Sequence, residues 1–553
     1  MPQYGENFLP NFRQGDIVML YERNGEEDNA TNHQIIRGNV EQIDMHHITV
    51  CLRNKQRNTA IFTPQSLYAI EHDYMDSSYT ALYKGLYALL TTPQHRKDLL
   101  LCRRQPETDT TLTINGHYPN RQIQEIVTKA KQAQDYFLLI GPPGTGKTSV
   151  ALRSMVEEFH GDADTNILLL SYTNRAVDEI CEMLDNISYK PDYLRIGSEL
   201  SCEKRFRPHL TGNMMQTCTN RIQVRQKLDT IRIIVGTVSS ISGHPELFEL
   251  KHFNIAIIDE ASQILEPQIL GILCAHQGEQ CAVDKFILIG DHKQLPAVVL
   301  QRTEESRVSN KQLNDIGLTD CRNSLFERLL GRQKQSHAYA MLHRQGRMHP
   351  DISGFVNRQF YNEQLDIVPV RHQQEPLEWI HYDKADDLQA LVATSRMKFI
   401  DIPYPPAEEP HKINRCEARQ TAALVKAIHE LCRQNNLPFN AARRIGIIVP
   451  FRNQIAMIAN ELALLDIEGT EEITIDTVER YQGSQRDIII FSTTVSQRYQ
   501  LDILSVSSIT DGQTIDRKLN VALTRARKQM FIVGNAHLLN NLPIYKQLIE
   551  YAK

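Results

Sequence analysis

One segment constrains the fold of this 553-residue chain more than any other. The sequence FLLIGPPGTGKTS, at residues 137–149, places a glycine-rich loop between a strand-like apolar run and a helical segment. Glycines in such a loop let the backbone turn tightly, so that successive N–H groups point at phosphate oxygens. This order of strand, loop and helix predicts an α/β sheet with a phosphate-binding loop at the end of one strand.

Short apolar runs separated by helical segments continue after that loop. One series lies between residues 137 and 289, and a second lies between residues 445 and 533. Such runs are typical of strands buried on both faces of a parallel sheet. We therefore predict two α/β lobes with parallel sheets, lobe 1 at residues 118–340 and lobe 2 at residues 341–553, with a hinge within 335–375.

The N-terminal part of the chain has a different pattern. GDIVMLY (15–21), IIRGNVEQID (35–44) and HITVCLRN (47–54) alternate apolar and polar side chains between turn-forming clusters. Alternation with a period of two predicts half-buried strands, and we expect residues 1–72 to form a small barrel or sandwich. Residues 73–117 begin with helical spacing of their apolar side chains, which predicts helices there.

Composition excludes several classes of protein. The chain carries 61 Lys and Arg against 66 Asp and Glu, a net charge of −5, so any nucleic-acid contact must be a local patch. The ten cysteines never form a tight metal-ligand spacing such as CxxC. The start lacks a signal-peptide pattern and no apolar stretch approaches ~18 residues, so we expect a cytoplasmic protein with no membrane partner.

The glycine-rich loop carries the pattern GxxxxGKT, which is typical of nucleotide-phosphate binding. Lys147 would place its charge on the β- and γ-phosphates, and the Thr148 hydroxyl would hold Mg²⁺. The nearest approach to a guanine-reading Asn-Lys-x-Asp sequence, at 310–313, lacks the aspartate, so ATP is preferred. The predicted loop ligands are Gly141, Pro142, Pro143, Gly144, Thr145, Gly146, Lys147, Thr148 and Ser149.

An acidic pair supplies the second half of such a site. NIAIIDEAS (254–262) ends an apolar run with Asp259 and Glu260, and open α/β sheets bind ligands beyond the carboxyl ends of their strands. Asp259 would hold Mg²⁺, and Glu260 would accept a proton from the attacking water. A solvated strand end is the commoner explanation for such a pair alone, but the upstream phosphate loop favours the catalytic interpretation.

Five further motifs follow in a fixed order. They are SYTNRAVDEI (171–180), ILIGDHKQLPA (287–297), LHRQGRMHPDIS (342–353), TIDTVERYQGSQRDIIIFS (474–492) and LNVALTRARKQMFIVGN (519–535). With the phosphate loop and the acidic pair, this order resembles the superfamily 1 helicases of the nonsense-mediated-decay-helicase and senataxin-like branch, over about residues 118–540. The resemblance implies two RecA-like lobes, an N-terminal β-barrel on a helical stalk, and a small inserted subdomain at 195–230.

The resemblance also assigns roles to individual residues. Gln122 would read adenine, with Gln124 as an alternative because the spacing can be read either way. Gln294 would sense the γ-phosphate and couple it to the bound strand. Arg347 and Arg525 would be two arginine fingers contributed by lobe 2, because a planar guanidinium suits the charge that spreads over phosphoryl oxygens in the transition state.

Four polar residues match the strand-binding positions of that family: Thr173, Asn174, Thr237 and Thr477. Hydroxyl and amide side chains suit phosphate and sugar contacts, which position a strand without reading its sequence. Each of the four could equally cap a helix. Residues 195–235 contain eight basic side chains against three acidic ones, which favours a strand path, although a basic run can also be a solvated face.

The sequence therefore predicts an ATP- and Mg²⁺-dependent motor that moves 5′ to 3′ on single strands and unwinds duplexes, with the direction taken from the resemblance alone. An ATP-gated clamp that remodels a nucleoprotein without separating strands is the alternative. A helicase–nuclease fusion has little room, because the motifs and the N-terminal segment occupy nearly the whole chain. DNA and RNA stay open as substrates, since backbone contacts do not specify the sugar unless a 2′-hydroxyl is read, and protein partners are unknown.

Overall fold

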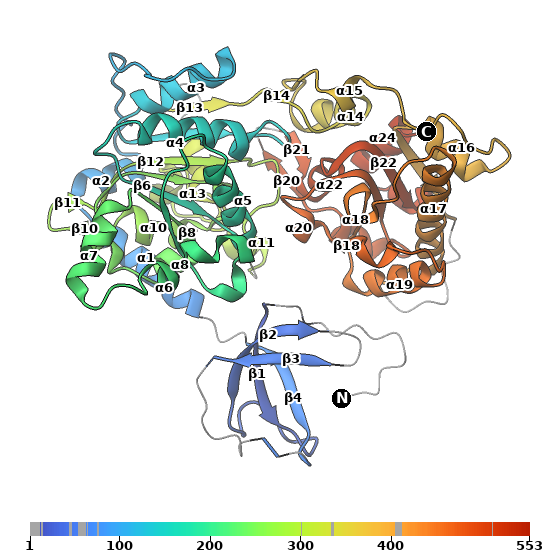
Figure 1. Ribbon diagram of the computed structural model, residues 1–553, viewed down its shortest axis with the longest axis horizontal. Helices are drawn as coiled ribbons and strands as arrows, with labels where there is room; N and C mark the ends of the chain where they lie inside the picture. Colours follow the sequence, from blue (N-terminus) through green and yellow to red (C-terminus); the bar gives the residue numbers. More distant parts are fainter. Residues whose placement is uncertain are drawn as a thin grey trace.

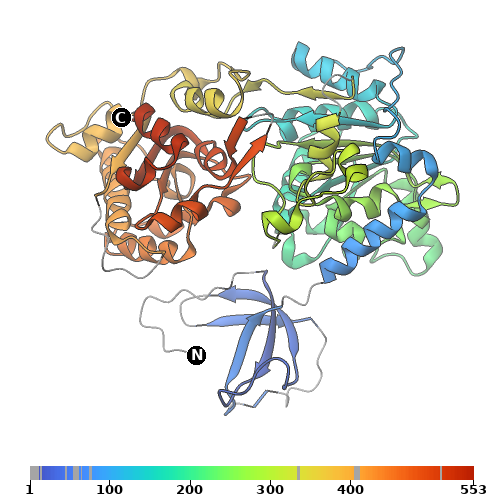
Figure 2. The same cartoon turned by 180° about the vertical axis from the view of Figure 1, so that it is seen from behind.

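The chain folds into two α/β lobes and a smaller β-domain, as the computed structural model shows (Figure 1). The two lobes lie side by side, and the β-domain lies next to both, joined to lobe 1 through helix α1 (Ser77–Thr91) (Figures 1 and 2). The structure describes residues 12, 15–43, 47–53, 62–63, 65–73, 77–299, 301–332, 337–403, 412–510 and 513–553.

Lobe 1 is built on a seven-stranded parallel sheet with the strand order β13-β5-β12-β9-β6-β8-β7. Inner strands such as β5 and β6 are apolar and fully buried, because helices cover both faces of the sheet. The strands are β5 (Tyr136–Ile140), β6 (Ile167–Ser171), β7 (Tyr193–Ile196), β8 (Ile233–Thr237), β9 (Phe253–Ile258), β12 (Val283–Gly290) and β13 (Tyr339–Met341).

Two apolar cores lie on the two faces of this sheet. One face is covered by α3 (Arg121–Gln132), η2 (Lys147–Leu152), α4 (Arg153–His160) and α5 (Asn174–Asp185). The other is covered by α2 (Gln94–Leu100), α8 (Val238–Ser242), α9 (Leu247–Leu250), α10 (Glu266–Leu273) and α13 (Leu325–Arg332). The other elements of lobe 1 are η3 (Glu199–Ser201), η4 (Lys204–His209), α6 (Thr211–Met214), α7 (Arg221–Thr230), η5 (Ala261–Gln263), β10 (His276–Gln277), β11 (Gln280–Cys281), α11 (Thr303–Ser306) and α12 (Lys311–Asp315).

Lobe 2 is built on a five-stranded parallel sheet with the order β16-β22-β19-β17-β18. Its strands are β16 (Met397–Asp401), β17 (Ile445–Val449), β18 (Thr474–Thr477), β19 (Arg486–Ser492) and β22 (Ala526–Gly534). Short strands β14 (Arg344–Gln345) and β15 (Asp366–Ile367) pair with each other, as do β20 (Ser507–Thr510) and β21 (Gln513–Asp516).

Helices again cover both faces of the lobe 2 sheet. One core contains α14 (Pro350–Phe360), α20 (Val478–Tyr481), α21 (Leu501–Leu504), α22 (Arg517–Leu523), α23 (Ala536–Leu539) and α24 (Pro543–Tyr551). The other contains α16 (Asp387–Thr394), α17 (Arg415–Gln434), α18 (Ala441–Arg444) and α19 (Arg452–Ala463). Single turns form α15 (Arg371–Gln374), η6 (Thr470–Glu472) and η7 (Arg498–Gln500).

The β-domain is an antiparallel sheet of β1 (Ile17–Glu22), β2 (Ile36–Ile43), β3 (Ile48–Leu52) and β4 (Tyr68–His72), in the order β3-β2-β1-β4. Within the part of this domain that the structure describes, no pairing joins β3 to β4, so closure into a barrel stays a prediction. Asp44 and Asn54, the ends of two predicted strands, lie outside the described residues.

The sheets agree with the sequence prediction of two parallel α/β lobes, and β13 crosses the predicted boundary between residues 340 and 341. The apolar run Ile231–Val235 of the first series forms a strand of the same length that begins two residues later, at Ile233, because Ile231 caps the C-terminus of α7. In the described segments, no helix combines the length and the apolar character needed to cross a lipid bilayer.

Candidate active site between the lobes

The glycine-rich loop connects β5 to η2 and needs glycine at several positions. Gly144 and Gly146 have φ angles of 75° and 78°, in the left-handed region that glycine adopts without strain. A Cβ on Gly144 would lie 2.4 Å from Cβ of Arg347, and one on Gly141 would lie 2.0 Å from Cγ of Lys147. The loop therefore turns tightly and lets a later part of the chain approach its backbone.

The acidic pair at the end of β9 lies against the start of η2. Lys147 Nζ is 3.1 Å from Glu260 Oε1, and the Thr148 hydroxyl donates to Asp259 Oδ2 over 2.6 Å. Gln263 donates its side-chain amide to Glu260 Oε2 over 2.9 Å. The structure thus brings together four of the predicted site residues from two segments of lobe 1.

Charge pairing decides how these buried groups ionise. Burial works against the charged form of Lys147, but the carboxylates of Glu260 and Asp259 outweigh it and raise the pKa of that lysine. Burial also opposes ionisation of Glu260, but Lys147 outweighs it and lowers the pKa of this carboxyl. For Asp259, burial and the neighbouring Glu260 raise the pKa. The charge of Lys147 therefore favours the ionised form of Glu260.

The oxygen atoms of Thr148 and Asp259 suit Mg²⁺, which prefers oxygen ligands. Across the described residues, no group of three or more His, Cys, Asp or Glu could hold a metal by itself. Mg²⁺ is usually bound by one or two carboxylates together with substrate phosphates, so this small donor set fits the ion only beside a nucleotide.

Gln294 connects lobe 1 to lobe 2. Its side-chain nitrogen donates to Asp291 Oδ2 over 2.8 Å, and its oxygen accepts from Arg525 Nη2 over 3.4 Å. The Tyr361 hydroxyl also donates to Asp291, over 2.7 Å, and accepts from the Asn520 amide over 2.9 Å. A movement of the Gln294 side chain can therefore be transmitted to lobe 2 by two routes, directly through Arg525 and through Asp291 to Tyr361.

Two guanidinium groups lie at the junction of the lobes. Arg525 is 2% exposed and donates to the Ser484 carbonyl oxygen over 3.4 Å, while Arg347 donates to the Thr524 carbonyl oxygen over 3.3 Å. Burial lowers the pKa of both, and the nearby Arg347 adds to this effect on Arg525. Within the described residues neither forms an ion pair with a carboxylate, so both positive charges are available to an anionic ligand.

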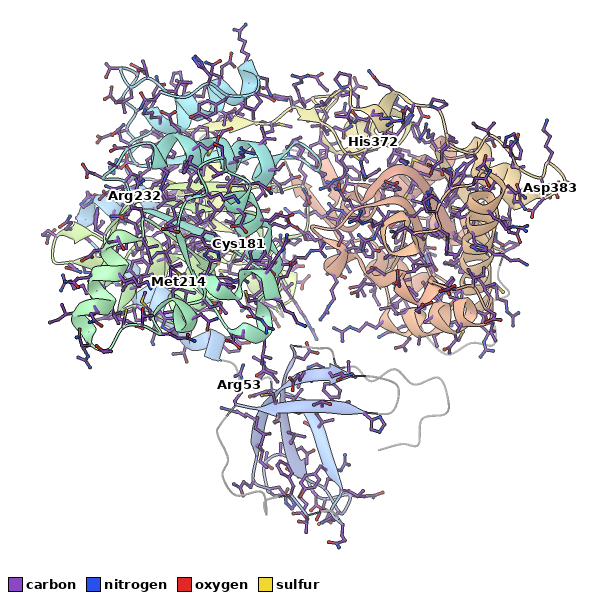
Figure 3. All side chains as sticks on the ribbon, viewed as in Figure 1. Arg53, Cys181, Met214, Arg232, His372 and Asp383 are labelled. Carbon is purple, nitrogen blue, oxygen red and sulfur yellow. The ribbon has the colours of Figure 1, made fainter. Side chains whose placement is uncertain are left out.

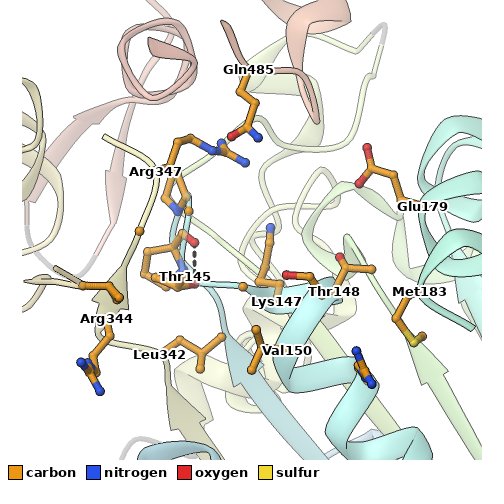
Figure 4. Close-up of a pocket in the computed structure, with 18 of the residues that line it drawn as sticks. Thr145, Lys147, Thr148, Val150, Glu179, Met183, Leu342, Arg344, Arg347 and Gln485 are labelled. Atoms are coloured by element: carbon orange, nitrogen blue, oxygen red, sulfur yellow. Dashed lines mark hydrogen bonds between the residues drawn. The ribbon is translucent and has the colours of Figure 1, made fainter. Parts of the chain in front are cut away.

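A single cavity of about 1090 Å³ connects these groups. It is lined by residues 142–149 of the loop, by Glu260 and Gln294, and by Arg347 and Arg525 from beyond β13. Lys147 projects into it in Figure 4, with Arg347 and Gln485 on one side and Glu179 of α5 on another. Cavities of this order hold drug-sized ligands, so a nucleotide fits.

The two candidate adenine readers, Gln122 and Gln124, have different surroundings in the structure. Gln122 lines the cavity, accepts from the His343 backbone N–H over 3.4 Å and donates to the Met341 carbonyl oxygen over 3.4 Å. Gln124 is exposed on α3 and is absent from the lining of that cavity. Gln122 therefore lies in the cavity lining beside β13, whereas Gln124 does not line this cavity.

The predicted strand contacts lie at the carboxyl ends of β6, β8 and β18. Thr173 and Asn174 are exposed, and Thr173 caps α5 by accepting from the Ala176 N–H over 3.2 Å. Thr237 is buried and caps α8 by accepting from the Ser240 N–H over 3.0 Å, and Thr477 is buried at the start of α20. Helix capping thus accounts for two of these threonines, and their contact with nucleic acid stays a prediction.

The predicted basic stretch is partly used inside lobe 1. Arg195 is buried and pairs with Asp178, and Lys227 donates to the Met214 carbonyl oxygen. Arg232, labelled in Figure 3, donates to the carbonyl oxygen of His160 over 3.1 Å. Counting charges along the sequence therefore overestimates the basic surface of this segment, because the count cannot tell a solvated arginine from a buried one.

Sequence reasoning did not identify Tyr361 and Asn520, which connect the lobes. Asn520 lies inside LNVALTRAR, so its motif was recognised, but its role as a donor to the Lys293 carbonyl oxygen over 2.7 Å required the structure. Tyr361 follows α14 in a stretch without a recognisable motif, and no signal in the sequence distinguishes it from other core tyrosines.

Comparison with known proteins places the chain in a family. Two family models described as AAA domain match residues 118–221 and 211–302, and residues 321–537, together more than half of the chain. The DNA replication ATP-dependent helicase/nuclease DNA2 of Bos taurus is 26% identical over 99% of this chain and 51% of its own length.

Two further relatives support the same placement. The DNA polymerase alpha-associated DNA helicase A of Saccharomyces cerevisiae is 27% identical over 73% of this chain and 63% of its own length. Regulator of nonsense transcripts 1 of Dictyostelium discoideum is 27% identical over 75% of this chain and 31% of its own length. The chain spans about half the length of the helicase/nuclease relatives that it matches over nearly its whole extent. With the ordered motifs and the cavity between two parallel-sheet lobes, these matches show that the chain belongs to the superfamily 1 helicases of the DNA2/NAM7-like branch.

Proposed function

We propose that the chain is an ATP-dependent helicase or translocase that couples hydrolysis to movement along a nucleic-acid strand. The observation that carries this proposal is the composition of the cavity. Lys147 and Glu260 come from lobe 1, whereas Arg347 and Arg525 come from the part of the chain beyond β13. Because both parts supply charge to one cavity, nucleotide turnover is tied to the relative position of the lobes.

Each side chain has a defined task in this proposal. Lys147 exchanges its contact with Glu260 for phosphate oxygens, which leaves the ionised Glu260 free to accept a proton from the attacking water. Arg347 and Arg525 stabilise the negative charge that develops on the transferred phosphoryl group. Thr148 and Asp259 would hold Mg²⁺, which when bound neutralises charge on the phosphates.

Gln122 is the proposed adenine reader, supported by its place in the cavity lining beside β13. Gln294 links the phosphate end of the cavity to lobe 2 through Arg525. Thr173 and Asn174 are the strongest of the proposed strand contacts because both are exposed. Thr237 and Thr477 are weaker candidates because both are buried. We retain 5′-to-3′ movement, the β-domain as a barrel on a stalk of residues 73–117, and a cytoplasmic location as predictions.

The test is ATPase activity measured with no nucleic acid, single-stranded DNA, single-stranded RNA and duplex, across a salt series, beside a strand-displacement assay. A motor predicts stimulation by single strands, a steep loss of stimulation with salt, and strand displacement. Stimulation without displacement or translocation would instead identify an ATP-gated clamp. Hydrolysis that ignores every polymer would refute both.

A further inference from the structure

Glu158 is a buried carboxylate that the proposed chemistry does not use. It lies on α4, which directly continues η2, so Glu158 and Lys147 belong to one continuous helical segment. Its side chain is 0% exposed. A buried carboxylate is costly unless it is paired and hydrogen-bonded, so its partners show what it stabilises.

Every hydrogen-bond partner of the Glu158 carboxylate in the described part of the chain comes from the segment around α3. Its carboxylate accepts from the backbone N–H of Asn115 over 2.9 Å, from that of Gly116 over 3.1 Å, and from the Tyr118 hydroxyl. Lys131 pairs with it over 2.6 Å. Burial opposes ionisation of Glu158, but Lys131 and Tyr118 outweigh it and lower the pKa of this carboxyl. One ionised side chain therefore holds four donors.

The clamped segment leads directly into the cavity. Pro119 and Asn120 follow Tyr118 and line it, and Asn120 also caps α3 by accepting from the Ile123 N–H over 3.1 Å. Gln122, in the first turn of α3, lines it as well, and Lys131 lies in the last turn of the same helix. Glu158 thus holds the chain both before and after Gln122.

We propose that Glu158 is a positioning residue that fixes the base-reading segment against the phosphate-binding helix. It holds Gln122 at a set distance from the phosphate loop, and so determines how strongly the cavity binds the base of a nucleotide. This inference rests on the proposed function, because it requires the cavity to bind ATP. Inorganic tripolyphosphate has no base, so its binding to the loop should not depend on the clamp.

The test uses the full chain with Glu158→Gln. An amide nitrogen would then face donors instead of accepting from them. ATP should bind about tenfold more weakly, the order expected for losing charge-assisted hydrogen bonds, whereas tripolyphosphate affinity should stay within about twofold. The maximal hydrolysis rate at saturating ATP should remain close to that of the native chain. The control is Glu461→Gln on α19, whose side chain pairs with Arg419 over 3.6 Å away from the cavity lining, and it should change neither affinity.

Tyr118→Phe provides a second variant that removes a single donor and keeps the carboxylate and Lys131. It should shift the ratio of ATP to tripolyphosphate affinity in the same direction by a smaller factor. A ratio unchanged from the native chain in both variants, or equal weakening of both ligands, would overturn the inference. Failure of the native chain to bind ATP would instead refute the proposed function, so the two failures are distinguishable.

Discussion

At the scale of single residues, Lys147 and Glu260 form an ion pair with each other. In the proposed function, a bound nucleotide separates the two side chains. Their contact of 3.1 Å uses the lysine that phosphates need and the carboxylate that the attacking water needs. The sequence identified both residues, because each belongs to a short motif with a fixed place at a strand end. It could not indicate that they pair with each other, since 112 residues lie between them.

Mutation of each residue can distinguish the role of Lys147 in binding ATP from the role of Glu260 in hydrolysis. Lys147→Ala should abolish hydrolysis and weaken ATP binding, because no other lysine among the described residues lines the cavity. Glu260→Gln should still bind ATP but should largely stop hydrolysis, since an amide cannot take the proton. Nucleotide affinity and single-turnover rates of both variants check this. A Glu260→Gln variant that binds ATP poorly yet hydrolyses it at the native rate would exclude the general-base role.

Glu417 predicts a pH dependence of stability that is independent of the nucleotide site. This carboxyl of α17 accepts hydrogen bonds from Asn414, Ser492 and Thr494, and burial raises its pKa to about 8 from the ordinary value of 4.5. Because the folded pKa is the higher one, its contribution to stability is complete below the unfolded pKa and is lost as pH rises through the folded pKa.

The free energy of unfolding of the native chain should therefore fall relative to that of Glu417→Gln between about pH 5 and about pH 8. Denaturant titrations of both chains at several pH values measure this difference. A difference that stays constant over the range would show that Glu417 does not titrate there.

At the scale of elements, the central strands and the edge strand β18 could be predicted, whereas the other three edge strands could not. β6 and β9 are mostly apolar because helices bury both of their faces. β7, β13 and β16 lie at sheet edges and pair with one neighbour each. An edge strand needs fewer apolar residues, so sequences such as YLRI and MKFID carry little signal above the surrounding chain.

Helix α1 makes one contact that the sequence did not reveal, its close packing on α10. A Cβ on Gly85 would lie 1.8 Å from the carbonyl oxygen of Pro267, so only glycine fits there. Gly85→Ala should lower the free energy of unfolding by about 1–3 kcal/mol through overpacking. The matched control is Gly331→Ala on α13, where a Cβ meets nothing within 4 Å. It should be neutral or stabilising by up to about 1 kcal/mol, because alanine favours a helix.

Denaturant unfolding of the two glycine variants checks this prediction. Equal stability of Gly85→Ala and Gly331→Ala would contradict the packing described for α1. If the packing is correct, α1 should also be attached less firmly to lobe 1 in the Gly85→Ala chain. Limited proteolysis should then cut between the β-domain and lobe 1 sooner than in the native chain.

At the scale of the whole molecule, the lobes meet through specific polar contacts as well as through the cavity. Arg517 of α22 pairs with Glu327 of α13 over 2.7 Å, and Asn520 donates to the Lys293 carbonyl oxygen over the same distance. Composition and spacing predicted two lobes, but the orientation of one lobe against the other depends on such contacts. The two residues of each contact are distant in sequence and do not lie in the same motif, so the contacts could not be predicted from the sequence.

The central claim is that both lobes contribute charge to one hydrolytic site. Its most direct test is single-turnover hydrolysis beside nucleotide affinity for Arg347→Ala and Arg525→Ala, and for the corresponding lysine variants, with saturating single strand. An arginine finger is worth ~10³–10⁵ in rate, so each alanine variant should lose far more in hydrolysis than in affinity. Lysine should not restore the rate, because an ammonium cannot form the bidentate fork. Near-native hydrolysis in both alanine variants would contradict a composite site.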